Sequence, residues 1–107
     1  MAQAVKVVKV AALADLAESG GTPVDVGGRT LLVCRSGTGL FVIENLCSHQ
    51  QAKLEGGKVK GPHIFCPLHG VRFDMRDGTP NGTLTRKPIA VFPASVVDGV
   101  VYAELPA

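Results

Sequence analysis

Tryptophan is missing from this chain of 107 residues, and only one tyrosine is present. An apolar core must therefore be built mainly from aliphatic side chains. Long apolar runs are missing as well, because no stretch approaches the roughly 18 residues that indicate a membrane span. Residues 1–14 are interrupted by Lys6 and Lys9 and do not resemble a targeting signal. The net charge of +2 does not by itself indicate nucleic acid as a partner. We expect a soluble, cytoplasmic protein.

What the sequence does contain is typical of short strands joined by turns. Valine is frequent, and it favours strands together with Ile, Thr and Phe. The pairs Gly27-Gly28 and Asp98-Gly99 are two-residue hairpin signals. Leu13 and Leu16 are spaced for one or two helical turns over residues 11–17. The pattern predicts an all-β sandwich or partly open barrel, with strands over residues 4–10, 23–26, 29–35, 39–44, 58–60, 63–65, 72–74, 89–92, 95–97 and 100–103.

Two short segments carry the chemistry, Cys47-Ser48-His49 and Cys66-Pro67-Leu68-His69. Together they read C-x-H, sixteen residues, C-x-x-H, so that each segment offers one thiol and one imidazole. Both ligand types suit iron in iron–sulfur chemistry. Zinc is the alternative, in a zinc-stapled structural or interaction domain. Zinc sites usually pair Cys with Cys and His with His, however, whereas each pair here is mixed.

The motif, extended through Gly70-Val71-Arg72-Phe73-Asp74, resembles that of the Rieske ferredoxins, and the resemblance covers nearly the whole chain. It implies one 2Fe-2S cluster in which the cysteines hold one iron and the histidines the other. These four ligands would be Cys47, His49, Cys66 and His69. Two neutral imidazoles in place of two thiolates raise the reduction potential of such a cluster.

The same resemblance implies the Rieske fold, with a single domain over residues 1–107. An antiparallel β-sandwich base, residues 1–45 and 83–107, would carry a small cluster-binding subdomain at about residues 46–82. Leu54 and Leu68 could shield the cluster from water, and His63 should lie at the surface outside the motif. The core is expected to include Val8, Leu31, Val33, Phe41, Ile43, Val91, Phe92, Val101 and Leu105.

Cysteine is scarce, with three residues in all. If Cys47 and Cys66 hold iron, Cys34 is left alone and no disulfide framework can form, which fits a reducing cytosol. Cys34 lies in the strand-like run of residues 31–35. We interpret it as a small buried hydrophobic residue rather than a reactive thiol.

The sequence departs from the Rieske proteins of respiratory complexes. Those proteins carry a further cysteine in each ligand loop, and the two form a disulfide. Here the corresponding loops hold Leu68 and Gln50-Gln51-Ala52. Those proteins also place a serine and a tyrosine two and four residues after the last histidine, where this chain has Val71 and Phe73. Neither side chain can donate a hydrogen bond, so we expect a potential near the low end of the Rieske range, about −150 mV.

These features resemble the ferredoxin components of bacterial aromatic-ring dioxygenase systems. The resemblance implies a one-electron carrier, expected to be monomeric, between a flavin-dependent ferredoxin reductase and a terminal Rieske non-haem iron oxygenase. The chain is too short for the second iron site of such an oxygenase, so we expect a carrier rather than an enzyme. A small Rieske subunit of another reductase, such as a nitrite reductase, remains an alternative.

The charges are distributed unevenly along the chain. Residues 46–87 hold seven Lys or Arg against three Asp or Glu, and the remainder holds four against six. An ordinary solvated surface would account for this. The functional interpretation is that the cluster end is positive and steers the protein toward acidic patches on its partners.

We predict that Val71→Ser combined with Phe73→Tyr raises the reduction potential. Each new hydroxyl can donate a hydrogen bond to a site that gains negative charge on reduction. A hydrogen bond worth ~1 kcal/mol more in the reduced form shifts a one-electron potential by roughly 40 mV. Protein-film voltammetry measures the shift. An unchanged or lower potential in a variant whose crystal structure shows both hydrogen bonds would contradict this account.

Overall fold

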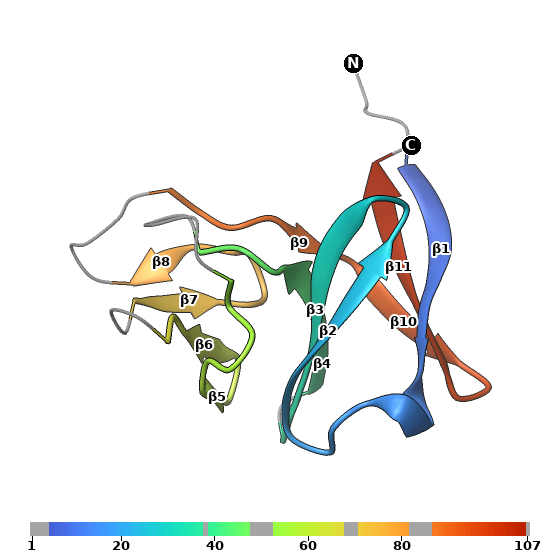
Figure 1. The fold of residues 1–107 in the computed structure, drawn as a ribbon, viewed down its shortest axis with the longest axis horizontal. Coiled ribbons are helices and arrows are strands. Elements are labelled where there is room, and N and C mark those ends of the chain that lie inside the picture. Colours follow the sequence, from blue (N-terminus) through green and yellow to red (C-terminus); the bar gives the residue numbers. More distant parts are fainter. Residues whose placement is uncertain (1–4, 38, 48–52, 68–70, 82–86, 107) are drawn as a thin grey trace.

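A computed structural model of the chain describes residues 5–37, 39–47, 53–67, 71–81 and 87–106 (Figure 1). Eleven strands and one short helix are found in these residues. In chain order they are β1 (Val5–Ala12), the 3-10 helix η1 (Leu13–Asp15), β2 (Gly20–Val26), β3 (Arg29–Ser36), β4 (Gly39–Glu44), β5 (Val59–Lys60), β6 (His63–Phe65), β7 (Arg72–Asp74), β8 (Pro80–Asn81), β9 (Val91–Phe92), β10 (Ala94–Val97) and β11 (Val100–Pro106).

The strands form three antiparallel sheets. Sheet A has the order β1-β11-β10, sheet B the order β2-β3-β4-β9, and sheet C the order β5-β6-β7-β8. Figure 1 shows sheets A and B together as a larger base, with sheet C as a smaller unit beside it. The predicted all-β class with antiparallel strands is therefore confirmed. No helix in the described residues is both long and apolar enough to cross a membrane.

Both hairpins predicted from two-residue turns are confirmed. Gly27 and Gly28 have φ angles of 56° and 81°, and they connect β2 to β3. Asp98 and Gly99, at 51° and 74°, connect β10 to β11 in the same way. Positive φ at both central residues is what a type I′ turn requires, and its twist matches that of the flanking strands.

The region after β1 differs from the prediction of one or two helical turns over residues 11–17. Ala11 and Ala12 continue β1, where they pair with Val101 and Val100. Only the single 3-10 turn η1 follows, because strand pairing takes the first residues of the expected helix. Leu16, which follows this turn, is buried. Strand β8 was not predicted, since its two residues lie in a segment rich in turn residues.

Sheet B is covered on both faces. Leu31 and Val33 of β3 belong to the apolar cluster of the base, whereas Leu32 and Cys34 belong to a second cluster shared with sheet C. Successive side chains of a strand point to opposite faces, so this continuous apolar run is buried throughout. Of the predicted core residues, Leu31, Val33, Ile43, Val101 and Leu105 are buried. The others, Val8, Phe41, Val91 and Phe92, are partly buried and pack against the two clusters.

We predict that Cys34 does not react with maleimide in the folded, cluster-loaded protein. The side chain is fully buried, and burial raises the pKa of its thiol to about 12, so almost no thiolate is present at pH 8. Mass spectrometry of the intact protein measures the modification. Val7→Cys supplies a matched exposed thiol, since Val7 is 61% exposed. Labelling of Cys34 as fast as that of the introduced cysteine would favour the reactive-thiol interpretation.

Candidate metal centre

The two predicted thiol ligands lie just beyond strands of two different sheets. Cys47 follows β4 after two residues, and Cys66 directly follows β6. Their side chains are 0% and 2% exposed, and both belong to the apolar cluster that joins sheet B to sheet C. Cysteines from two separate segments are thus brought into one apolar environment.

The two predicted imidazole ligands, His49 and His69, lie outside the described residues, as does Leu68. Within the described part of the chain, no group of three or more His, Cys, Asp or Glu side chains forms a metal site. The set of four ligands therefore stays a prediction, of which the structure places the two cysteines.

Backbone pairing closes the segment that carries the second ligand pair. The N–H of Cys66 donates to the carbonyl oxygen of Val71 at 2.8 Å. Directly beyond this bond, Phe65 pairs with Arg72 in the β6–β7 ladder. The ladder fixes both ends of the segment from Cys66 to Val71.

A buried asparagine closes the segment that carries the first ligand pair. Asn45 is 3% exposed and is the one buried polar side chain among the described residues. Its Oδ1 accepts a hydrogen bond from the Glu55 N–H at 2.9 Å, and its Nδ2 donates to Glu55 Oε1 at 3.0 Å. Its own N–H donates to the Thr30 carbonyl oxygen at 3.1 Å. We call these bonds the Asn45–Glu55 clamp, because they tie the two ends of residues 45–55 to each other and to β3.

Close backbone contact extends the clamp toward sheet C. The N–H of Gly57 donates to the Leu54 carbonyl oxygen at 2.9 Å. A Cβ at Gly57 would collide with the carbonyl oxygen of Phe65, so only glycine fits between the two segments. The N–H of Phe65 in turn donates to the Lys58 carbonyl oxygen at 2.9 Å.

The surroundings of the two thiols fit an iron–sulfur cluster. Leu54, Ile64 and Phe73 are fully buried in the same apolar cluster as both cysteines. Such walls exclude water, and thiolates are the ligands that iron–sulfur clusters prefer. Val71 is also buried there, so the two positions that lack hydroxyl donors contribute apolar surface.

His63 was expected to lie at the surface outside the motif, and the structure places it in β6, where it is half-buried. It stands in register with Lys60 and Asp74. Because its neighbour Ile64 points into the apolar cluster, the imidazole belongs to the opposite face of sheet C. The structure therefore gives no reason to add it to the ligand set.

Asn45 and Glu55 are the site residues that the sequence analysis missed. Neither belongs to the C-x-H or C-x-x-H pattern, and their pairing needs the loop to be folded. The signal available was weak: a polar residue directly after a strand rich in buried apolar positions.

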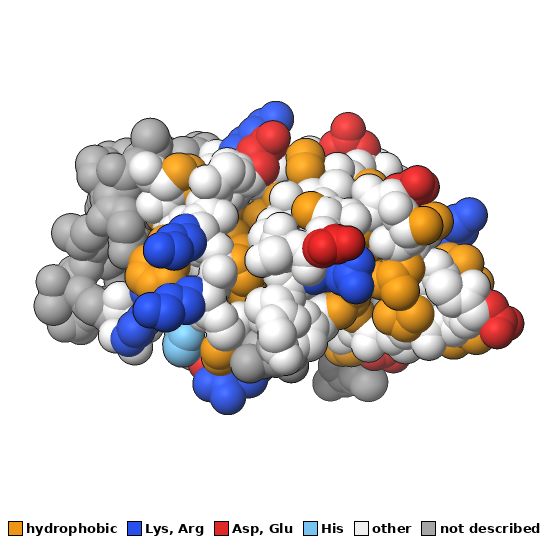
Figure 2. Space-filling model, turned by 90° about the horizontal axis from the view of Figure 1, so that it is seen from below, with side chains coloured by type: hydrophobic (Ala, Val, Ile, Leu, Met, Phe, Trp, Pro, Cys, Tyr) orange, Lys and Arg blue, Asp and Glu red, His pale blue; other side chains and the backbone are white. Residues whose placement is uncertain are grey.

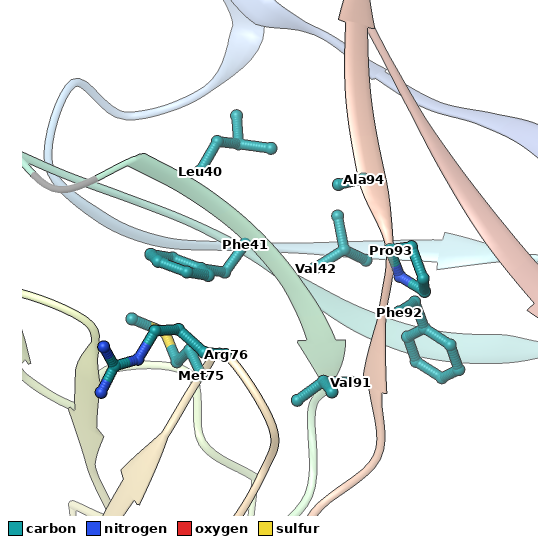
Figure 3. Close-up of a pocket in the computed structure, with 9 residues that line it drawn as sticks. All are labelled: Leu40, Phe41, Val42, Met75, Arg76, Val91, Phe92, Pro93 and Ala94. Carbon is teal, nitrogen blue, oxygen red and sulfur yellow. The ribbon is translucent and has the colours of Figure 1, made fainter.

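A groove between the base and sheet C has a volume of about 460 Å³ (Figure 3). Apolar side chains such as Phe41 and Val91 line it, with Arg76 from the sheet C side. The Arg76 guanidinium binds Asp74 at 2.6 Å and holds the pKa of that carboxyl at about 2. The described lining includes no His, Cys, Asp or Glu, so this groove lacks the groups for acid–base or nucleophilic catalysis.

Comparisons with known proteins agree with this geometry. Residues 6–93 match the Rieske [2Fe-2S] domain family. The anthranilate 1,2-dioxygenase ferredoxin subunit of Burkholderia cepacia is 37% identical over 79 residues, which cover 74% of this chain and 73% of that protein. The structure of the ferredoxin of carbazole 1,9a-dioxygenase from Nocardioides aromaticivorans IC177 has a TM-score of 0.82 at 34% identity, covering 91% of this chain and 95% of that one. A solved complex of reduced oxygenase and oxidised ferredoxin in carbazole 1,9a-dioxygenase matches with a TM-score of 0.79 at 34% identity, with 91% of each chain covered.

We predict that Asn45→Ala weakens the site without removing a ligand. The substitution removes both side-chain hydrogen bonds between Asn45 and Glu55, at a cost of about 1–3 kcal/mol. The urea midpoint should fall, and the visible absorbance should bleach faster when a chelator is added.

Lys53→Gln is the matched control for this variant. It removes the 3.7 Å ion pair with Glu55, in which the Lys53 side chain is 67% exposed. Exposed pairs contribute little, so its midpoint and bleaching rate should stay close to those of the unmodified chain. Equal behaviour of the two variants would show that the clamp does not hold the loop.

Proposed function

The chain belongs to the Rieske [2Fe-2S] domain family, and on this premise we propose that it is a one-electron carrier. It holds one Rieske-type 2Fe-2S cluster. It accepts electrons from a flavin-dependent ferredoxin reductase and passes them to a terminal Rieske non-haem iron oxygenase. It is an electron-transfer component of a multicomponent aromatic-ring dioxygenase and not itself an enzyme.

The observation that carries this proposal is the burial of Cys47 and Cys66 in one apolar cluster. In our proposal these cysteines hold one iron, while His49 and His69 hold the other. When bound, the cluster supplies a redox couple that exchanges one electron at a time. The chain's own residues fix the ligand loops, through the Asn45–Glu55 clamp and the Cys66–Val71 hydrogen bond, and they exclude water from the thiolate side.

The relatives support the partners in this proposal. The Burkholderia protein is named as the ferredoxin subunit of a dioxygenase, and the carbazole 1,9a-dioxygenase structure is a complex of a ferredoxin with its oxygenase. By analogy we propose the terminal oxygenase as electron acceptor and a flavoprotein reductase as donor. A monomer in the cytoplasm also belongs to the proposal, and the three cysteines, which form no disulfide in the described residues, suit that compartment.

The domain organisation completes the proposal. We propose that residues 1–107 form a single Rieske domain in which residues 46–82 act as the cluster-binding subdomain. Sheet C, from Val59 to Asn81, lies within those bounds and supports them. The zinc alternative loses its basis, since the family that the chain matches binds an iron–sulfur cluster. The alternative function, a small Rieske subunit of another reductase such as a nitrite reductase, differs from this proposal in the protein that accepts the electron.

We predict that alanine at any one of Cys47, His49, Cys66 or His69 abolishes or severely damages the cluster. Each iron has only two protein ligands, so the loss of one leaves the iron open to solvent. Iron and sulfide analysis and the electron paramagnetic resonance spectrum of the reduced protein provide the measurement. His63→Ala and Cys34→Ala are matched controls that should keep full iron content. A His69→Ala protein with native iron and spectrum would remove that residue from the ligand set.

Reconstitution tests the carrier function itself. The cluster-loaded protein is mixed with a flavoprotein ferredoxin reductase and a terminal Rieske oxygenase from the same organism, and stopped-flow absorbance follows each electron. The proposal expects reduction of this chain by the reductase and its reoxidation by the oxygenase, each at rates that rise with its concentration. A fully loaded cluster that neither partner reduces or oxidises would show that the chain has another role.

A further inference from the structure

Sheet C has an inner face buried against sheet B and an outer face that is charged. Ile64 and Phe73 stand opposite each other in the β6–β7 ladder and are fully buried. Side chains alternate along a strand, so their neighbours His63, Phe65, Arg72 and Asp74 project from the other face. We call this surface the outer face of sheet C.

Strand register brings three basic residues together on this outer face. Lys60 pairs with His63, and Arg72 pairs with Phe65. Lys58 lies beside the Arg72–Phe65 pair, because its carbonyl oxygen accepts the Phe65 N–H. Lys58 and Lys60 are exposed, and Phe65 and Arg72 are half-buried. The result is an aromatic side chain flanked by cations.

The positive charge of this face is not neutralised by nearby carboxylates. Its one carboxylate, Asp74, is bound by Arg76 at 2.6 Å. Counting Arg76 and the neighbouring Asp77, four cations stand against two anions on and beside the outer face. Figure 2, seen from below the view of Figure 1, shows Lys and Arg side chains gathered at the sheet C end. Lys53, by contrast, is paired with Glu55 on the first ligand loop.

The outer face is also close to the metal centre along the chain. Phe65 directly precedes Cys66, and Arg72 directly follows Val71, which accepts the Cys66 N–H. A partner seated on the outer face would therefore rest against the base of the second ligand loop. Since one covalent step joins Phe65 to Cys66 and one hydrogen bond joins Cys66 to Val71, such a position suits transfer of an electron to or from the metal centre.

Resting on the proposed function, we propose that the outer face of sheet C is the surface that docks the electron-accepting oxygenase. The fitting patch on that partner is acidic, with an apolar centre opposite Phe65. Charge complementarity between exposed groups acts mainly on the association rate, so the contact forms quickly and dissociates quickly. This is what a carrier that visits two partners in turn requires.

The chain offers a charge-matched test. Lys58→Glu/Lys60→Glu reverses two exposed lysines on the outer face, and Lys6→Glu/Lys9→Glu reverses two exposed lysines on β1 in the base. Both double variants change the formal net charge from +2 to −2, so any effect of total charge is the same in each. Visible absorbance and the electron paramagnetic resonance spectrum check that both keep an intact cluster.

Stopped-flow measurement of oxygenase reduction decides the proposal. At low ionic strength we expect the outer-face variant to lose roughly tenfold or more in the second-order rate constant, and the β1 variant to stay within about twofold of the unmodified chain. The difference should shrink as the Debye length falls from about 30 to 8 Å.

Four results would overturn the proposal. Equal losses in both variants would show a net-charge effect without a docking surface, and no loss in either would leave the outer face without a role, although the carrier function would stand. A loss confined to the step from the reductase would assign the face to the donor instead. If the unmodified, fully loaded chain cannot reduce the oxygenase at any ionic strength, the proposed function itself fails and the docking surface fails with it.

Discussion

The structure depends on one apolar layer between sheet B and sheet C. Strand β3 supplies Leu32 and Cys34 to this layer while it supplies Leu31 and Val33 to the base. The two parts of the molecule are therefore joined by burial of side chains from one shared sheet, and the hydrophobic effect holds sheet C in place. Because Cys47 and Cys66 belong to this layer, burial of the apolar core also brings the two thiols into one environment.

Two sets of hydrogen bonds fix the ligand segments that the apolar layer brings together. Apolar contacts are non-directional and cannot set the path of a loop, whereas hydrogen bonds can. The Asn45–Glu55 clamp and the Cys66–Val71 bond each tie the two ends of a ligand segment together. A buried asparagine is costly unless its amide is satisfied, and here both the Oδ1 and the Nδ2 of Asn45 bind Glu55. Hydrogen bonds within the chain thus hold the ends of both ligand segments.

The two thiols of the metal centre are buried, so partners must recognise the chain at its surface. The large groove of the described residues is apolar and lacks acid–base groups, while the thiols are shielded in the core. Recognition is left to the surface, where some cations form ion pairs with carboxylates and others do not. Lys53 and Arg76 have carboxylate partners. Lys58 and Lys60, by contrast, are exposed to solvent beside Phe65. We therefore expect the choice of partner to depend on the surface charges near the metal centre.

The sequence by itself determined the features that arise from neighbouring residues. The two-residue turns at Gly27-Gly28 and Asp98-Gly99, the alternating strands and the Cys–His spacing are all local, and local backbone preferences need no distant partner. Only the tertiary structure decided how β1 displaces most of the expected helix, how sheet B is buried on both faces, and how Asn45 meets Glu55. It also decided which cations are neutralised. These outcomes depend on contacts between segments far apart in the chain, and no local propensity contains them.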